Sequence, residues 1–282
     1  MRRFEGQVVV VIGSATGLGR AMAEEFARQG AQLVLADIDT NKVNEALQSV
    51  EALGAQAIAV KTDVMKREYL VALAQATLER FGCVDIVCSN AGVGEYSCSA
   101  WEKGDTDLDW VLGVNLYGTA YAVSAFIPIM LKQGQGHFVS TGSNTSLQPI
   151  PSMAVYAASK RAVLGYCEAL QYDLWNADSA VKVSVICPNK VITDMPDSAR
   201  NRPQNLAGRT PTAQEIARKT AFLAAGGHTP DEAAKIVLDG IAEQRFYILT
   251  NPVDAEQAQA WAAGVRDGHL VRPNYAPPKL GR

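Results

Sequence analysis

The sequence predicts an α/β fold: a doubly wound parallel sheet of seven strands in a single domain, with a C-terminal helical extension. Three observations predict it. Seven short apolar runs rich in β-branched residues recur along the chain, longer helical stretches separate them, and a glycine-rich turn follows the first run. Continuous apolar runs of this kind are typical of strands that helices cover on both faces.

The bulk composition excludes several classes of protein. The chain of 282 residues is long enough for one large α/β domain or two small ones, and the uninterrupted alternation favours one. Its formal net charge of -3 leaves no basic field for nucleic acid or anionic lipid. No apolar run approaches the roughly 20 residues of a membrane helix. We therefore expect no nucleic-acid or membrane partner.

The strands are expected where β-branched and apolar residues cluster between turn signals. In order, they are predicted at about 7–12, 32–36, 56–60, 84–88, 136–141, 182–187 and 246–249.

Helical spacing fills the gaps between these runs. The stretch "GRAMAEEFARQG" carries apolar residues at Ala23, Phe26 and Ala27 and ends at Gly30. The stretch "LDWVLGVNLYGTAYAVSAF" predicts one long apolar helix that contains Asn115. Because this helix and the one carrying "YAASK" are apolar on more than one face, including at Tyr117 and Trp175, we expect both to be buried. Part of that surface is a candidate subunit contact.

Two segments depart from the alternation. Residues of about 195–227, with "MPDSARNRPQNLAGRTPT", form a longer connection than usual, typical of a binding loop but also of a tolerated surface excursion. Arg200 and Arg202 in it either bind a substrate carboxylate or face water. After Leu249, the spacing of Ala258, Trp261 and Val265 predicts an extra helix.

The turn after the first strand reads "GSATGLG", with Gly13, Gly17 and Gly19 ahead of a helix. Glycine permits a sharp turn and a close backbone approach, and exposed helix N–H groups favour a pyrophosphate. Three glycines alone are a weak signal, but the strand before them and the helix after them strengthen it.

Asp37 ends the second strand, where a carboxylate can accept hydrogen bonds from the adenosine ribose hydroxyls and repel a 2′-phosphate. No lysine or arginine stands at Ala15 or Ile38 to compensate a phosphate, so the sequence favours NAD over NADP. The alternative is that Asp37 only belongs to a helix-capping turn with Asp39 or Thr40. Asp63 and Asn90 follow the third and fourth strands, at the sheet edge where ligands bind.

Two tyrosine–lysine pairs share a spacing of four residues, Tyr156 with Lys160 and Tyr275 with Lys279. In "YAASK" the intervening residues are helix formers, so both side chains lie on one face of a helix. In "YAPPK" two prolines disrupt helical geometry. A phenol is a poor base at neutral pH, and a neighbouring ammonium lowers its pKa. Tyr156 is therefore the candidate acid/base group, and a serine near the end of the fifth strand, Ser140, Ser143 or Ser146, can hold the substrate oxygen.

These motifs resemble those of the short-chain dehydrogenase/reductase family over roughly residues 5–250. The glycine motif is similar to "IGSATGLG", the adenine pocket to Asp63 and Val64, and the NAG motif to Asn90, Ala91 and Gly92. The stretch "CPNKVITDM" is similar to the family segment that grips the nicotinamide. The resemblance implies a Rossmann fold, with residues 1–250 as the dinucleotide-binding and catalytic domain, about 195–227 as its substrate loop, and 251–282 as an extension.

The resemblance also implies roles for individual residues. The implied catalytic residues are Asn115, Ser143, Tyr156 and Lys160. The residues implied to bind the cofactor NAD are Gly13, Thr16, Gly17, Leu18, Gly19, Asp37, Asp63, Val64, Asn90, Gly92, Tyr156, Lys160, Val191 and Thr193. Asn115 would hold a proton-relaying water near Lys160, the alternative being a plain helix–helix hydrogen bond. Ile12, Gly142 and Asn189 depart from the usual family residues, and none of these changes removes a catalytic group.

The resemblance thus implies an NAD-dependent dehydrogenase that interconverts a secondary alcohol and a ketone, on a bulky hydrophobic, cyclic or aryl substrate. Two alternatives stay open: an NADPH-dependent ketoreductase, and a catalytically silent NAD-binding regulator. We expect a homodimer or homotetramer, no metal, and a cytoplasmic location. The five cysteines form no CxxC pair and the three histidines have no metal-ligand spacing, which agrees with reduced thiols and no metal site.

Overall fold

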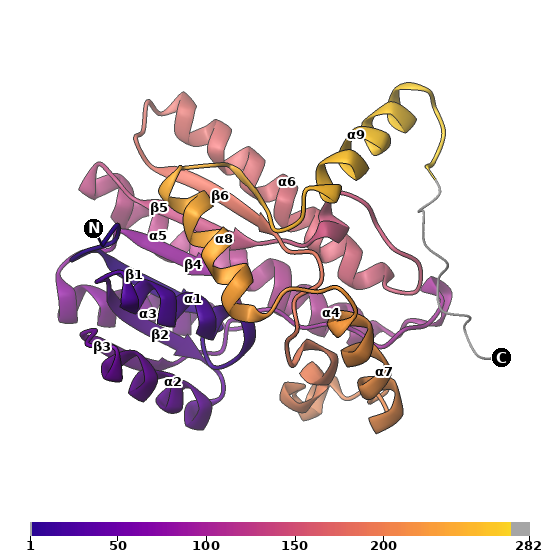
Figure 1. The fold of residues 1–282 in the computed structure, drawn as a ribbon, viewed down its shortest axis with the longest axis horizontal. Coiled ribbons are helices and arrows are strands. Elements are labelled where there is room, and N and C mark those ends of the chain that lie inside the picture. The colour runs from indigo at the N-terminus through magenta and orange to yellow at the C-terminus, as the bar shows by residue number, and fades with distance from the viewer. Residues whose placement is uncertain (1, 272–282) are drawn as a thin grey trace.

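The computed structural model describes residues 2–271. Within them a parallel sheet of seven strands has the order β3-β2-β1-β4-β5-β6-β7, with helices on both of its faces (Figure 1). The strand order reverses between β1 and β4, and this switch point is where doubly wound sheets bind ligands. The predicted fold class is confirmed.

Each predicted strand is present within two residues of its expected bounds. The strands are β1 (Val8–Ile12), β2 (Gln32–Asp37), β3 (Ala57–Lys61), β4 (Ile86–Ser89), β5 (His137–Thr141), β6 (Lys182–Cys187) and β7 (Tyr247–Leu249). Neighbouring strands pair in parallel, and the central strand β1 is fully buried. Alternation of side chains along β1 sends Val9 and Val11 to one face of the sheet and Val10 and Ile12 to the other.

Helices α1 (Gly17–Arg28), α2 (Thr40–Ala52) and α8 (Pro230–Ala242) cover one face of the sheet. Their apolar sides meet the strands around Met22 and Phe26, which are fully buried. The other face is covered by α3 (Arg67–Phe81), α5 (Gly118–Gln133) and α6 (Ala154–Asn176), whose core includes Phe126 against Phe138 of β5. The two cores hold the sheet rigid, so its carboxyl edge is a fixed platform.

The predicted long helix around Asn115 is not one regular helix. It runs as α4 (Asp105–Leu112), a π-helical turn (Gly113–Tyr117) and α5. π-turns inside helices frequently mark functional positions. By length and composition Asp105–Gln133 could cross a membrane. Its buried Trp110 and Phe126 pack in the protein cores, so we assign it to the interior of the fold.

The expectation that these helices are buried on more than one face is wrong at two positions. Tyr117 is 52% exposed and Trp175 is 59% exposed, whereas Trp110 is buried. Both exposed rings lie on the outer side of helices whose inner sides pack on the sheet, and aromatic residues alone do not distinguish the two sides.

The segment predicted as a long connection contains helix. Short 3-10 turns at Met195–Asn201 and Gln204–Leu206 precede α7 (Ala213–Ala224), which lies outside the layers of the sheet and its covering helices (Figure 1). Thr212 caps α7 with its hydroxyl, and Glu215 returns the contact to the Thr212 backbone. The prolines and glycines just before this helix are typical of loops, so the composition of the segment did not predict α7.

The predicted tail helix is α9 (Val253–Arg266). A hydrogen bond and a cation–π contact join it to the rest of the domain. Asp254, fully buried, accepts a 2.6 Å hydrogen bond from Asn189 Nδ2, and the Arg161 guanidinium lies 4.1 Å from the centroid of the Trp261 ring. The helix therefore packs against the loop after β6 and against α6.

Candidate active site

The turn between β1 and α1 is shaped by close backbone contacts. Gly13 has a φ of +83°, and a Cβ on it would stand 2.6 Å from the backbone of Ala91. A Cβ on Gly19 would collide with the Gly13 carbonyl and the Asn90 amide. Thr16 precedes α1 without capping it, so the first amides of the helix lack a side-chain partner. This is the geometry of an anion-binding turn, with Leu18 buried beneath it.

Asn90 ties this turn to the neighbouring strands. Its Nδ2 donates to the Gly13 carbonyl at 3.0 Å, and its Oδ1 accepts from the Thr141 hydroxyl at 3.0 Å. The amide thus links the ends of β1, β4 and β5 at the carboxyl edge of the sheet.

Asp37 lies at the end of β2 beside the glycine turn. Its carboxylate accepts hydrogen bonds from the backbone N–H groups of Ala15 at 3.0 Å and Asp39 at 3.1 Å. The helix cap expected as an alternative is made by Asp39, whose Oδ1 accepts from Lys42 N. Burial raises the pKa of Asp37, and the backbone hydrogen bonds act in the opposite direction. Asp37 thus does not cap α2 itself, but it holds the N-cap residue Asp39, so Asp37 is bound both to the glycine turn and to the turn that opens α2.

Asp63 and Val64 follow β3 at the same edge. Asp63 Oδ1 accepts a hydrogen bond from Met65 N, and Val64 is buried against Gly118, where a Cβ would stand 3.0 Å from the Val64 side chain. The pair forms a tight turn over the start of α5.

The segment after β6 lies next to the glycine turn. Val191 is buried and forms an isolated bridge with His228. Thr193 reaches the turn itself, since a Cβ on Gly17 would stand 3.0 Å from Thr193 Cγ2. The structure thus places Thr193 against the glycine turn and Val191 in the buried stretch just before it.

Tyr156 and Lys160 lie on the first turns of α6, as predicted, and both side chains are buried. The Lys160 ammonium lies 5.9 Å from the centroid of the Tyr156 ring and donates to the Thr141 carbonyl at 2.8 Å. A Cβ on Gly92 would stand 3.3 Å from Lys160 Nζ, so the NAG segment passes directly over the ammonium.

Burial sets the proton affinities of this pair. Desolvation lowers the pKa of Lys160 to about 8 and raises the pKa of Tyr156, while a contact with the Ser143 side chain lowers the latter. For Tyr156, burial has the larger effect and the Ser143 contact the smaller one.

Of the three serines near the end of β5, Ser143 is the one beside Tyr156. It accepts a 3.2 Å hydrogen bond from Thr145 N and donates to Asn144 Oδ1 at 3.1 Å. Ser140 is fully buried within β5, and Ser146 donates to the Lys160 carbonyl. We therefore assign structural roles to both of these serines.

Asn115 lies in the π-helical turn and is almost completely buried. Its Oδ1 accepts from Val93 N at 2.8 Å, and its Nδ2 donates to the Val93 carbonyl and to Ser159 Oγ. The amide therefore binds the NAG segment to α6, and its Oδ1 is 3.4 Å from the Cβ position of Gly92. Both roles expected for Asn115, the water relay and the plain hydrogen bond, require this location.

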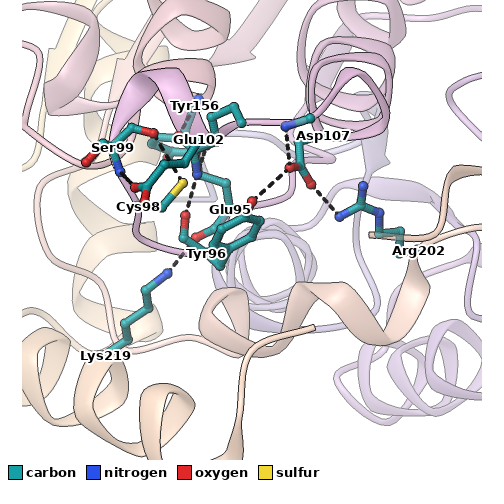
Figure 2. A network of polar contacts seen from close by, with 11 residues as sticks. Glu95, Tyr96, Cys98, Ser99, Glu102, Asp107, Tyr156, Arg202 and Lys219 are labelled. Carbon is teal, nitrogen blue, oxygen red and sulfur yellow. Dashed lines mark hydrogen bonds and ion pairs between the residues drawn. The ribbon is translucent and has the colours of Figure 1, made fainter. Parts of the chain in front are cut away.

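One residue at the site is absent from the sequence prediction. Glu95, just beyond the NAG segment, accepts a 2.9 Å hydrogen bond from the backbone N–H of Tyr156 (Figure 2). The available signal was a lone carboxylate in an apolar stretch, "NAGVGEY". No spacing rule joins it to a residue 61 positions away. The other pair, Tyr275 with Lys279, lies outside the described residues.

The candidate site therefore gathers its predicted residues along one carboxyl edge of the sheet. Among the described residues no group of three or more His, Cys, Asp or Glu side chains could hold a metal ion. The arrangement offers a glycine turn suited to an anion, a carboxylate beside that turn, and a buried phenol with a hydroxyl and an ammonium nearby.

Comparison with known proteins agrees with this geometry. The sequence model of the family described as short chain dehydrogenase matches residues 7–204. The 1-deoxy-11-beta-hydroxypentalenate dehydrogenase of Streptomyces avermitilis is 33% identical over 274 residues, which cover 96% of this chain and 94% of that protein.

Two solved structures are similar over most of the chain. A short chain dehydrogenase/reductase from Burkholderia phymatum in complex with NAD is 38% identical with a TM-score of 0.90, and the match covers 99% of this chain and 100% of that one. An alcohol dehydrogenase from Thermococcus sibiricus complexed with 5-hydroxy-NADP is 25% identical with a TM-score of 0.72, and the match covers 87% and 96%. Similar structures thus bind nicotinamide cofactors of both kinds.

Proposed function

The chain belongs to the short-chain dehydrogenase family, and from this premise we propose that it is an NAD-dependent dehydrogenase interconverting a secondary alcohol and a ketone. The single observation that carries the proposal is the buried group of Tyr156, Lys160 and Ser143 beside the glycine turn. A phenol, an ammonium and a hydroxyl in this arrangement can move the proton of an alcohol and hold its oxygen.

The chain's own residues fit the cofactor. The shape of the turn at Gly13 and Gly19 leaves backbone N–H groups for a pyrophosphate, and Asp37 supports ribose binding and disfavours a 2′-phosphate. NAD bound in this cleft would supply the acceptor for the hydride of the alcohol carbon. We propose that Thr16, Leu18, Asp63, Val64, Asn90, Gly92, Val191 and Thr193 complete the binding surface with Gly17, Tyr156 and Lys160.

In the proposed reaction, the Tyr156 phenolate takes the proton from the substrate hydroxyl, and Ser143 holds the substrate oxygen. Lys160, anchored by the Thr141 carbonyl, supplies positive charge near the phenol. Because burial raises the pKa of Tyr156 in the protein alone, we expect the positive nicotinamide ring to be needed for ionisation. Asn115 holds the NAG segment against Lys160 and supports the proton relay.

The substrate is proposed to be a bulky hydrophobic, cyclic or aryl alcohol. The dehydrogenase from Streptomyces avermitilis, whose name indicates a hydroxylated carboxylate as the compound that it oxidises, supports this direction at 33% identity. The segment 195–227 with α7 is the proposed substrate loop, because its Met195 and Ser198 lie over Gly94 at the mouth of the site.

Residues 1–250 are the proposed catalytic domain, and 251–282 the proposed extension. A homodimer or homotetramer is proposed on the basis of exposed aromatic residues such as Tyr172 and Trp175 on α6. A cytoplasmic location is proposed as well, supported by five free cysteines. Burial raises the pKa of Cys88, Cys167 and Cys187 to about 12, so these three thiols are unreactive.

The first test is Tyr156→Phe. Loss of the phenolic oxygen is expected to lower kcat at least about a hundredfold, since acid–base catalysis contributes about 10²–10⁴. The measurement is NADH formation with a panel of cyclic, aryl and steroidal secondary alcohols. The matched control is Tyr166→Phe, the same change on the same helix at a residue that is 37% exposed.

Full turnover by Tyr156→Phe would contradict the proposal. Wild-type binding of NAD without oxidation of any alcohol would instead identify a silent regulator. A higher kcat/KM with NADPH than with NADH would identify a ketoreductase of the NADPH type.

A further inference from the structure

The first turn of α6 is capped by a residue distant in sequence. The helix begins after Met153, which supplies no side-chain cap, so its first amides lack partners within the helix. Glu95, 61 residues upstream of Tyr156, provides an acceptor for one of these amides: its Oε1 accepts a 2.9 Å hydrogen bond from Tyr156 N (Figure 2). A carboxylate at this end is also favoured by the helix dipole.

The charge of Glu95 is balanced inside the protein. Lys103 Nζ lies 2.6 Å from Glu95 Oε2, and both side chains are only 2% exposed. The same ammonium donates to the Tyr96 carbonyl at 2.5 Å and lies 4.1 Å from the centroid of the Tyr96 ring. A buried carboxylate is costly unless it is paired and hydrogen-bonded, and Glu95 is both.

The backbone of Glu95 is held from the other side by the substrate loop. Lys219 of α7 donates a 2.5 Å hydrogen bond to the Glu95 carbonyl (Figure 2). Burial lowers the pKa of Lys219, and the charge of Lys103 acts in the same direction. Glu95 is therefore fixed between the start of α6 and the proposed substrate loop.

We propose that Glu95 is a positioning residue for Tyr156. By accepting the Tyr156 amide hydrogen it fixes the backbone of the first turn of α6, and with it the direction in which the phenol enters the site. Proton transfer requires the phenol oxygen within hydrogen-bond reach of the substrate, so a small shift of this turn lowers the rate. The inference rests on the proposed function of Tyr156 as acid/base.

The test compares two double variants that both lack the ion pair. In E95Q/K103M the glutamine oxygen still accepts the amide hydrogen, and in E95M/K103M no acceptor is left at similar volume. We expect kcat to be about tenfold lower in E95M/K103M than in E95Q/K103M. The reason is that E95M/K103M loses the hydrogen bond that orients the backbone of Tyr156. The KM for NAD is expected to agree within about twofold, because neither residue faces the glycine turn.

A second measurement does not depend on activity. With tyrosines labelled by ¹⁵N, the exchange rate of the Tyr156 amide is expected to rise in E95M/K103M relative to E95Q/K103M. Asp107→Asn is the control for general destabilisation. It breaks the other buried ion pair of this region, Asp107 with Arg202 at 2.7 Å, without touching the Tyr156 amide, whose exchange should stay as in the wild type.

Equal kcat values and equal exchange rates in the two double variants would overturn the inference. A difference in kcat accompanied by an equal change in KM for NAD would also overturn it, since it would indicate a general structural effect. If the wild type oxidises no alcohol, the proposed function fails on its own, and the exchange measurement still decides whether Glu95 fixes this turn.

Discussion

Asp37 is the side chain on which we propose that the choice between the two cofactors depends. Its carboxylate is oriented by hydrogen bonds from Ala15 N and Asp39 N, which hold it beside the glycine turn. A fixed negative charge there accepts from ribose hydroxyls and repels a phosphate. The choice between NAD and NADP is therefore expected to depend on this residue.

We predict that Asp37→Ser lowers kcat/KM for NAD by about tenfold, because a hydrogen bond to a charged group contributes about 1.5–3 kcal/mol. The activity with NADP should rise relative to that with NAD. Initial rates with both cofactors measure the ratio. Asp39→Ser, which changes only the cap of α2, should keep the wild-type ratio. An unchanged ratio in Asp37→Ser would contradict the assignment.

Most of the residues that the sequence identified stand at the end of a strand or in a fixed helical spacing, whereas Asn115 followed only from the family resemblance. Tyr156 and Lys160 follow from the i, i+4 rule, and Asn90 from its place after β4. Glu95 and Asp254 could not be found this way. Their partners, Tyr156 and Asn189, lie 61 and 65 residues away, and only the packing of the folded chain brings them together.

At the scale of elements, the strands were the most predictable, since burial on both faces makes each an apolar run. The helices were predictable where one side packs on the sheet. The π-helical turn at Gly113–Tyr117 was not, because the sequence carries no local signal for it; within this turn Asn115 Oδ1 accepts a hydrogen bond from Val93 N of the NAG segment. The helix α7 was hidden by the prolines and glycines before it.

The element most open to experiment is α9. Asp254, in its first turn, is fully buried and holds the loop after β6 through Asn189. Burial raises the pKa of Asp254 to about 6, against an opposite effect of the Asn189 hydrogen bond. At a pH between the ordinary aspartate pKa and this raised value, the Asp254 carboxyl is ionised in the unfolded chain but still protonated in the folded protein. The free energy of unfolding therefore falls as pH rises through this range.

We predict that the free energy of unfolding of the wild type relative to Asp254→Asn falls by about 1 kcal/mol between pH 5 and pH 7. Urea unfolding at both pH values measures it. Asp267→Asn, at the exposed end of α9, is the matched control and should show no such step. A difference that is constant with pH would mean that Asp254 does not titrate in this range.

At the scale of the whole molecule, the two buried cores leave few ionisable groups inside, and those few control the response to pH. His137 at the start of β5 is one of them. Its Nε2 lies 2.7 Å from Ser184 Oγ, and Ser184 in turn donates to the Arg245 carbonyl. The histidine therefore donates from Nε2 to Ser184, and it links β5 to β6 and to the chain entering β7.

Burial lowers the pKa of His137 to about 4, with a smaller effect of the Lys182 charge in the same direction. The sign is opposite to that of Asp254. Below its ordinary pKa of about 6.5 the unfolded chain binds a proton that the folded chain does not. The contribution of His137 is thus present above this pH and is lost progressively as pH falls toward 4.

We predict that the free energy of unfolding of the wild type relative to His137→Gln rises by about 2 kcal/mol between pH 5 and pH 7. Glutamine keeps a donor for Ser184 and does not titrate. Any loss of packing in the variant lowers its free energy of unfolding equally at both pH values, so it does not affect the predicted change. Urea unfolding of both proteins gives the difference, and Asp254→Asn, with its opposite sign, is the internal comparison. A difference for His137→Gln that falls or stays constant as pH rises would show that the ring is already charged in the folded protein.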